Sequence, residues 1–402
     1  MSFGPGDRVS WNTPQGTTRG TVRSKHTQDL ECDGKTFRTS TSAGLLSDAA
    51  SRHGQPARMD WMDLLRGLAV LLVVVLHAAG IPHMNDHGVE LWSQLNELLE
   101  PFRMPLLMVL SGLLLPHSLA KPLLVYVRGK LCGIAWPLAL WMVLFGVVIY
   151  WNGPGDPQYW LTGDYLWFLM TLLICYALAL GLKPALNFAG RRATGRRSPA
   201  GLLPLTLTAV LGAIAMIALL EILQPEQLLI SRTLYYGAFF FLGSACVPAL
   251  ARWVSAPGRA VTLLCIGAGL CAYLGLSDPS FRTGTAVSAV TACMGIAVAL
   301  WCAPRVPASA VTTFLRWLGR NSLVVYVTHF PVIILTFRAA QALHLGPLAT
   351  VMICTVTGVT ATVLLVRLRP RTPWLYAFPR ARDAPQARGP MRVSEGADKV
   401  VG

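Results

Sequence analysis

Ten apolar runs of about 20 residues recur along this chain, and they constrain its fold more than any other feature. A run of that length crosses a bilayer as one α-helix, because a helix satisfies all its backbone polar groups internally. Only 13% of the residues are charged, about half the fraction usual in soluble domains. The sequence therefore predicts an all-α, polytopic membrane protein. The expected spans are 62–81, 102–118, 131–151, 164–182, 202–223, 233–251, 259–276, 283–303, 317–337 and 346–367.

The loops between these runs alternate in basic content. Those rich in Lys and Arg are 117–130, 183–197, 252–259, 305–320 and the chain beyond 367. Those without Lys or Arg are 152–163, 224–231 and 277–281. By the positive-inside rule the basic loops face the cytoplasm, which places both termini there. We therefore interpret the net charge of +15 as a topology signal, and we expect no nucleic-acid partner.

The two ends of the chain differ from the apolar middle. Residues 1–46 contain short β-prone runs separated by Gly and Asp turns, which predicts a small β-rich segment. The opening of this segment resembles small Tudor-like or SH3-like bacterial domains. We expect 47–58 to be a polar linker and 371–402 to be a disordered cytoplasmic tail. A true start at Met59 or Met62 and a binding role for the β-rich segment both remain open.

Arg66 and His77 lie in the first apolar run, and ionisable groups at membrane depth are costly enough to mark functional sites. Eleven helical steps return to within about 20° of the starting direction and rise about 16 Å, so both side chains share one face. Taken singly, Arg66 would snorkel to the cytoplasmic headgroups beside Asp63, and His77 would be an interfacial ring. Their shared face instead favours a cation that anchors an anionic group and a base that accepts a hydroxyl proton.

Arg103 begins the second run, at about the expected depth of His77. It is a candidate for stabilising an oxyanion, and the alternative is a simple ion pair with Glu100. Ser111 and Gly112 follow in the same run. Small residues let transmembrane helices approach closely, so we expect these two to serve packing.

The ninth run supplies further candidates for substrate binding. Asn321 and Ser322 precede it, and His329 lies about nine residues in, near mid-bilayer, where a polar ring needs a partner or water. His329 is as consistent with a structural role as with a place in the active cavity. Trp167 opens the fourth run, where it shapes the outer mouth or belongs to the interfacial aromatic belt.

The first outer loop, from His83 to His87, contains residue types that bind metals. It offers no third strong ligand of the kind that structural zinc sites use. We therefore expect no metal site.

Four segments, in this order, resemble the membrane-bound acyltransferase 3 family over about residues 59–370: DLLRGLAVLLVVVLHA, PFRMPLLMVLSGLLL, DYLWFLMTLLIC and LGRNSLVVYVTHFPV. The resemblance implies an enzyme that moves an acyl group, commonly acetyl from acetyl-CoA, to a hydroxyl of a sugar or glycosylated acceptor. The positions that match the family's motifs are Arg66, His77, Asn321, Ser322 and His329.

The resulting prediction is an O-acyltransferase in a bacterial cytoplasmic membrane, with acyl-CoA as donor substrate and no bound cofactor. His77 is the expected general base, Arg66 places the donor, and Arg103 stabilises the oxyanion. The acceptor stays open among envelope polysaccharide, glycolipid, exopolysaccharide and glycosylated natural product. One alternative is a transporter or flippase for a lipid-linked or anionic glycan, which would favour inverted repeats that the sequence does not display. Another is a membrane anchor that presents residues 1–46.

Overall fold

The computed structural model describes residues 8–13, 16–26, 30–32, 35–37, 44–47, 59–150, 153–194, 202–281 and 283–379. The chain separates into two units, Met1–Asp60 and Trp61–Gly402. The predicted linker beyond Ser47 and the predicted tail beyond Pro379 lie outside the described residues. We describe each unit by itself.

The first unit is built from strands, as its β-prone runs predict. They are β1 (Arg8–Thr13), β2 (Gly16–His26), β3 (Leu30–Cys32), β4 (Lys35–Phe37) and β5 (Gly44–Ser47). One antiparallel sheet has the order β1-β2-β5, and β3 pairs with β4 in a separate hairpin. In the first hairpin Arg8 lies opposite Thr21 and Thr13 opposite Gly16. The expectation of a small β-rich segment is confirmed.

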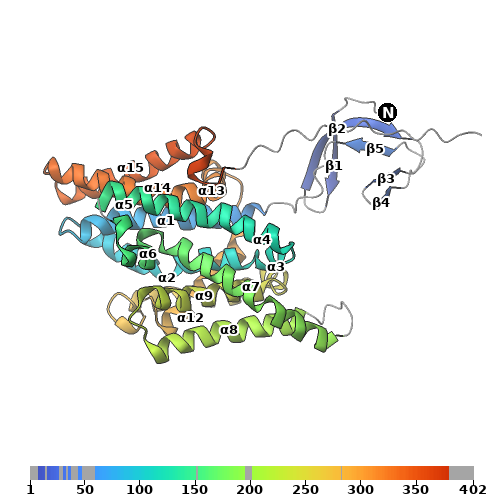
Figure 1. Ribbon diagram of the computed structural model, residues 1–402, viewed down its shortest axis with the longest axis horizontal. Helices are drawn as coiled ribbons and strands as arrows, with labels where there is room; N and C mark the ends of the chain where they lie inside the picture. Colours follow the sequence, from blue (N-terminus) through green and yellow to red (C-terminus); the bar gives the residue numbers. More distant parts are fainter. Residues whose placement is uncertain are drawn as a thin grey trace, which may run out of the picture. The chain divides into compact units, whose positions relative to one another are not determined.

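The second unit is helical throughout its described residues (Figure 1). Its α-helices are α1 (Asp60–His83), α2 (Glu90–Gly112), α3 (Leu115–Leu119), α4 (Leu123–Lys130), α5 (Trp136–Tyr150), α6 (Pro157–Thr162), α7 (Trp167–Thr194), α8 (Leu202–Leu223), α9 (Leu228–Cys246), α10 (Leu250–Val254), α11 (Gly258–Leu274), α12 (Ala286–Cys302), α13 (Ala310–Arg320), α14 (Ser322–Ala342) and α15 (Pro347–Leu368). Between them lie the π-helix η2 (Leu131–Ala135) and the 3-10 turns η3 (Gly153–Gly155), η4 (Asp164–Leu166), η6 (Pro279–Phe281), η7 (Ala303–Arg305) and η8 (Pro373–Leu375).

Among the described residues, seven helical segments are long and apolar enough to cross a membrane. They are Asp60–His83, Glu90–Leu119, Leu123–Tyr150, Pro157–Lys183, Ala286–Arg305, Ser322–Ala342 and Pro347–Leu368. The other three predicted runs also coincide with helices. Ala209–Leu223 and Gly258–Leu274 are apolar but shorter, and α9 has polar residues in its first turns. The multi-pass character is thus confirmed, whereas ten spans and the cytoplasmic termini stay predictions.

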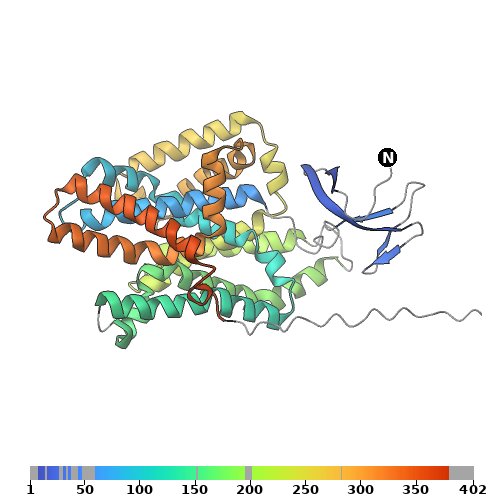
Figure 2. The same cartoon turned by 90° about the horizontal axis from the view of Figure 1, so that it is seen from above.

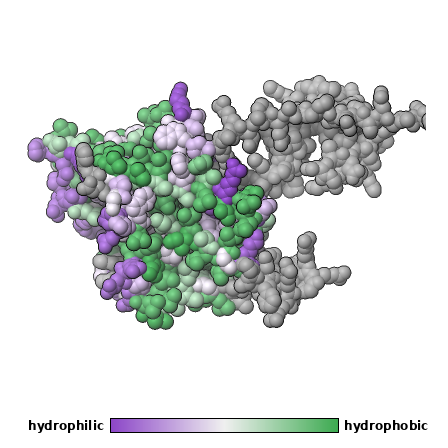
Figure 3. All heavy atoms as spheres, viewed as in Figure 1, coloured by the Kyte–Doolittle hydropathy of each residue, from purple (hydrophilic) through white to green (hydrophobic). Residues whose placement is uncertain are grey.

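The surface of the helical unit fits insertion into lipid. On the face seen in Figure 3, hydrophobic residues form a broad band, with hydrophilic residues gathered toward the ends of the helices. The exposed large apolar side chains include Leu263, Ile266 and Leu270 of α11. A soluble protein rarely exposes apolar patches of this extent, because water would drive them together.

The long helices pack side by side. Figures 1 and 2 show α14 beside α15, and α9 between α2 and α8, arrangements that the residue contacts confirm. The core consists of large side chains such as Met108 on α2 and Phe239 and Phe240 on α9. The bundle thereby holds the inward faces of α1, α2, α7 and α14 in fixed positions.

Two crossings are so close that only glycine fits. A Cβ added at Gly67 would overlap the Leu315 carbonyl, and one added at Gly319 would overlap the Asp63 carbonyl. The backbones of α1 and α13 therefore touch here, because each glycine leaves room for the other helix. Gly112 and Gly243 bring α2 and α9 together in the same way, which agrees with the packing role expected for Gly112.

α2 begins twelve residues before the run 102–118 that hydropathy indicates, at Glu90. Proline lacks a donor and clashes with the preceding turn, so Pro101 and Pro105 would each favour a break in a helix. The helix instead continues through both prolines. Within this part of α2, the Arg103 guanidinium donates to the main-chain carbonyl of Asn96 at 2.8 Å.

The segment that follows α15 packs over the start of α5, at least as far as Pro379. The prediction of a disordered tail is therefore wrong for residues 371–379. The indole of Trp136 donates to the Trp374 carbonyl at 2.8 Å, and that of Trp141 donates to the Leu375 carbonyl at 2.9 Å. The Phe378 amide donates to a carbonyl of the π-helix η2 at 3.0 Å. The Pro- and Arg-rich composition indicated disorder, because composition does not report contacts with residues that are distant in the sequence.

Candidate active site

The site is built on α1, which presents two ionisable side chains to its neighbours. Arg66 lies six residues after the first residue of α1, and His77 lies six residues before its last. An Arg66 Nη donates to the Leu110 carbonyl of α2 at 3.5 Å, and His77 contacts α14. Both side chains therefore point into the bundle and not into lipid.

His77 and His329 meet although 252 residues separate them in the sequence. The Nε2 atom of His329 lies 3.3 Å from Nδ1 of His77, and the ring centroids are 5.1 Å apart. His329 is 1% exposed. The ring of Phe330 packs edge-on against His77 at 5.0 Å. The two imidazoles thus form a pair inside the bundle.

The hydrogen bonds of the pair define where the protons lie. Nδ1 of His77 is 2.9 Å from the Val73 carbonyl, and Nδ1 of His329 is 3.1 Å from the Val325 carbonyl. A carbonyl oxygen only accepts, so both neutral rings carry their proton on Nδ1. His77 Nδ1–H is then shared between Val73 and Nε2 of His329. The Nε2 atom of His77 keeps its lone pair, which is the state a general base needs.

The close crossing at Gly67 and Gly319 helps to fix the positions of the two histidines relative to each other. Ten residues separate Gly67 from His77, and ten separate Gly319 from His329. His77 therefore stands about 15 Å along α1 from the crossing, whereas His329 lies on α14, the helix that follows α13. Beside the crossing, Arg320 Nε lies 3.2 Å from the buried Asp63 carboxylate, which ties the end of α13 to α1.

Arg103 is a buried cation inside the bundle. It is 2% exposed, and it donates to the side chain and the main chain of Asn96 at 3.2 and 2.8 Å. It lies on α2, which packs in the same helical bundle as the histidine pair. A guanidinium carries five N–H donors, and these contacts leave several unused.

Arg66 lies nearer the start of α1, where its guanidinium contacts the Leu110 carbonyl of α2. Lys130 Nζ, at the end of α4, lies 3.3 Å from the centroid of the Tyr176 ring on α7. The Tyr126 hydroxyl donates to the Tyr176 carbonyl at 2.8 Å. Sequence analysis did not single out Lys130, because it looked like one more charge of a basic loop.

Asn321 and Ser322 lie apart from the histidine pair, at the junction of α13 and α14. The Asn321 amide donates to the Trp317 carbonyl at 2.9 Å and accepts from Arg369 at 3.0 Å. These bonds occupy the Asn321 side chain in fixing the junction. The structure therefore gives Asn321 a positioning contact and shows no contact of Ser322 with the pair.

Trp167, the first residue of α7, packs beside α9. Its ring centroid is 4.7 Å from that of Tyr236, and the guanidinium carbon of Arg232 lies 4.7 Å from its ring. These contacts place Trp167 in a cluster with α9, and sequence reasoning missed Tyr236 and Arg232.

Two tyrosines link the 3-10 turn η4 to α14, and sequence reasoning missed both. The Tyr165 hydroxyl donates to the Val327 carbonyl at 3.0 Å, and the Tyr326 hydroxyl donates to the Tyr165 carbonyl at 2.8 Å. The Tyr326 ring lies 5.8 Å from that of His329. This exchange fixes the turn of α14 that carries His329.

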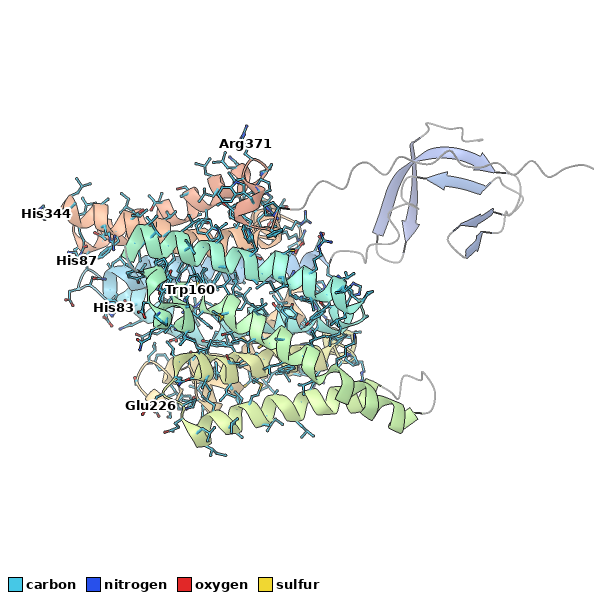
Figure 4. The ribbon with its side chains drawn as sticks, viewed as in Figure 1. His83, His87, Trp160, Glu226, His344 and Arg371 are labelled. Atoms are coloured by element: carbon cyan, nitrogen blue, oxygen red, sulfur yellow. The ribbon has the colours of Figure 1, made fainter. Side chains whose placement is uncertain are left out.

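The loop with metal-like residue types does not gather a ligand set. Figure 4 shows His83, His87, Glu226 and His344 at one end of the helical unit, around the ends of α1 and α14 and the start of α9. Within the described residues, no group of three or more His, Cys, Asp and Glu side chains is placed to hold a metal.

Together these features define a multi-pass helical membrane protein with a histidine pair and a buried arginine inside its bundle. The family model described as the acyltransferase domain of the acyltransferase 3 family matches residues 59–367. The chain therefore belongs to this family and is a membrane acyltransferase. The model of the Tudor domain of hypervirulence associated proteins matches residues 6–43. Searches of curated proteins and of solved structures find no match. Both resemblances noted in the sequence are confirmed.

Proposed function

We propose that the protein transfers an acyl group, acetyl in the first instance, from acyl-CoA to a hydroxyl of a sugar or glycosylated acceptor. The observation that carries this proposal is the histidine pair. The Nε2 atom of His77 carries no proton, and the Nε2 atom of His329 accepts from the Nδ1–H group of His77. This is the arrangement by which one group orients a general base for a hydroxyl.

The reaction follows from these positions. The acceptor hydroxyl gives its proton to His77 Nε2 while its oxygen bonds to the thioester carbonyl carbon. The Val73 carbonyl and His329 Nε2 then stabilise the proton on Nδ1 of the imidazolium. The tetrahedral oxyanion lies toward Arg103, whose unused donors stabilise it. The carbon–sulfur bond breaks, and the thiolate takes the proton from His77 as CoA leaves.

The donor is proposed to enter from the end of the bundle that carries Arg66 and Lys130. CoA bears phosphates, and Lys and Arg are the usual partners of phosphate groups. Lys130, which packs on the Tyr176 ring, and Arg66, which contacts α2, are the cations proposed for this role. Cytoplasmic acyl-CoA would then meet its acceptor across the membrane, with the chain in a bacterial cytoplasmic membrane and both termini inside.

The test uses the full chain in lipid nanodiscs with acetyl-CoA labelled in the acetyl group. Lipid-linked and polymeric glycans from the producing cell are offered as acceptors. We expect label to appear as an ester on a glycan, together with stoichiometric release of CoA. Movement of a glycan across a liposome bilayer without any change in its acylation would instead support a flippase. Acylation of an amine instead of a hydroxyl would reject the ester chemistry.

His329 acts as a positioning residue for His77 in this mechanism. Replacing it with phenylalanine should lower kcat by about 10-fold to 100-fold and leave the KM for acetyl-CoA unchanged. The loss is moderate because Val73 still holds the His77 proton on Nδ1. His329→Gln, whose amide oxygen can accept from His77, should recover part of the rate. A raised donor KM with unchanged kcat would contradict this role.

A further inference from the structure

Residues 367–379, here called the strap, run from the last turn of α15 onto α5. Arg367 lies in that last turn, Arg369 and Arg371 follow it, and all three side chains are exposed. Arg369 donates to Asn321 at 3.0 Å. Neither Arg367 nor Arg371 has a hydrogen-bond or ion-pair partner in the part of the chain that the structure describes. Figure 4 shows Arg371 pointing outward from the end of α15. The donors of both guanidiniums are therefore available to a partner from outside the chain.

The backbone of the strap is held by hydrogen bonds to the helices beneath it. Its carbonyls at Trp374 and Leu375 accept from two indoles of α5, and its Phe378 amide donates to a carbonyl of η2. Both elements belong to the candidate membrane span Leu123–Tyr150. Backbone polar groups beside lipid need partners, and these bonds supply them. The strap can therefore lie at the boundary between water and hydrocarbon, where a free backbone group would be costly.

The aromatic side chains of the strap divide into one that is buried and two that are exposed. Tyr376 is 2% exposed, and its ring stacks on Trp141 of α5. Trp374 and Phe378 are 46% and 47% exposed, although the Phe378 ring also packs edge-on against Trp136 at 4.9 Å. The buried ring fixes the strap to α5. Exposed aromatic rings beside exposed arginines are typical of segments that lie among lipid headgroups.

The charge of the strap selects an anionic partner. Residues 367–382 contain five arginines and no acidic residue. Guanidinium groups bind phosphates, and a basic cluster directly beyond a membrane span attracts anionic lipids. We propose that the strap is a binding surface for anionic phospholipid, with Arg367 and Arg371 on the headgroup phosphates and the rings of Trp374 and Phe378 among the lipids. A basic loop needs only charge to set topology, whereas this surface combines charge with exposed rings and a fixed backbone.

The test measures hydrogen exchange in the strap of the full chain. The protein is placed in nanodiscs of phosphatidylcholine, with or without added phosphatidylglycerol, and mass spectrometry follows peptides that contain the Phe378 amide. Because this amide is bonded to η2, it exchanges when the strap lifts off. We expect exchange to be about tenfold slower with phosphatidylglycerol, because bound lipid favours the strap in its docked position at the membrane boundary.

The variant that tests the surface combines Arg367→Gln with Arg371→Gln. It should exchange at the same rate in both lipids, and in phosphatidylcholine alone its rate should equal that of the unaltered protein, which shows that the strap still docks. The matched control combines Arg252→Gln with Arg259→Gln, two exposed arginines of a loop predicted to lie on the same side of the membrane. It should keep the full lipid effect. Loss of the effect in this control, or equal exchange of the unaltered protein in both lipids, would overturn the surface.

A second measurement identifies the occupant. Inorganic phosphate added to phosphatidylcholine nanodiscs should not slow the exchange, because a free anion gains nothing from the exposed rings. Native mass spectrometry of protein released from mixed nanodiscs should show phosphatidylglycerol retained in preference to phosphatidylcholine, and less of it on the Arg367 and Arg371 variant. Equal slowing by free phosphate, or retention of both lipids alike, would reject an anionic phospholipid as the occupant. None of these measurements requires acyl transfer, so their outcome is independent of the proposed function.

Discussion

Acyl transfer is expected to fall by about 10²-fold to 10⁴-fold when His77 is replaced by alanine, because the reaction loses its general base. The Nε2 lone pair of His77 is the atom that receives the hydroxyl proton, and Nδ1 of this ring is already bonded to Val73 and His329. His329 cannot take over. The Nε2 atom of His329 points at His77, so without His77 it would lie about the width of one imidazole ring too far from the acceptor hydroxyl. The measurement is single-turnover transfer of labelled acetyl in nanodiscs.

His83→Ala is the matched control for His77→Ala, since His83 is an exposed histidine at the end of the same helix. Its rate should equal that of the unaltered protein. Gel filtration and thermal unfolding must show that both variants fold alike. Transfer by His77→Ala at more than about a tenth of the normal rate would reject His77 as the base.

Gly319→Ala is expected to cost about 3 kcal/mol or more of folding free energy, the upper range for overpacked sites. The added methyl would overlap the backbone carbonyl of Asp63, which cannot move aside as a flexible side chain can. Gly67→Ala should have a similar effect from the other helix, through the Leu315 carbonyl. Reversible unfolding in mixed micelles gives the free energy, and the thermal midpoint gives the order of the variants.

Gly80→Ala is the control for the glycine variants, because a Cβ at that position meets nothing within 4 Å. It lies on α1 and tests helix propensity alone, so it should be neutral or slightly stabilising. Gly319→Ala at wild-type stability would show that α1 and α13 do not cross as closely as described.

The helices could be predicted because the length and hydrophobicity of each apolar run are enough to indicate a membrane-spanning helix. The helix α2 starts before the apolar run 102–118, because polar residues such as Glu90, Gln94 and Glu97 keep its first turns out of a run defined by hydropathy. The folded segment after α15 was missed because its stability comes from contacts with Trp136 and Trp141, which are more than 230 residues away.

The candidate site could be predicted only in part. Arg66 and His77 were found because helical periodicity puts them on one face. The pairing of His77 with His329 is a tertiary contact that no local pattern encodes. Arg232 and Tyr236 gave no signal, because a single arginine or tyrosine beside an apolar run looks like an interfacial residue. Their packing against Trp167 became visible only in the folded chain.

The crossing of Gly67 and Gly319 makes the histidine pair a sensitive reporter of helix tilt. With α1 held against α13 there, the His77 ring lies about 15 Å along α1 from the contact. A tilt of α1 by about 5° around this contact would displace the His77 ring by about 1.3 Å, enough to break the 3.3 Å imidazole contact. Small rocking of α1 against α14 would thus connect the base to its support or disconnect it.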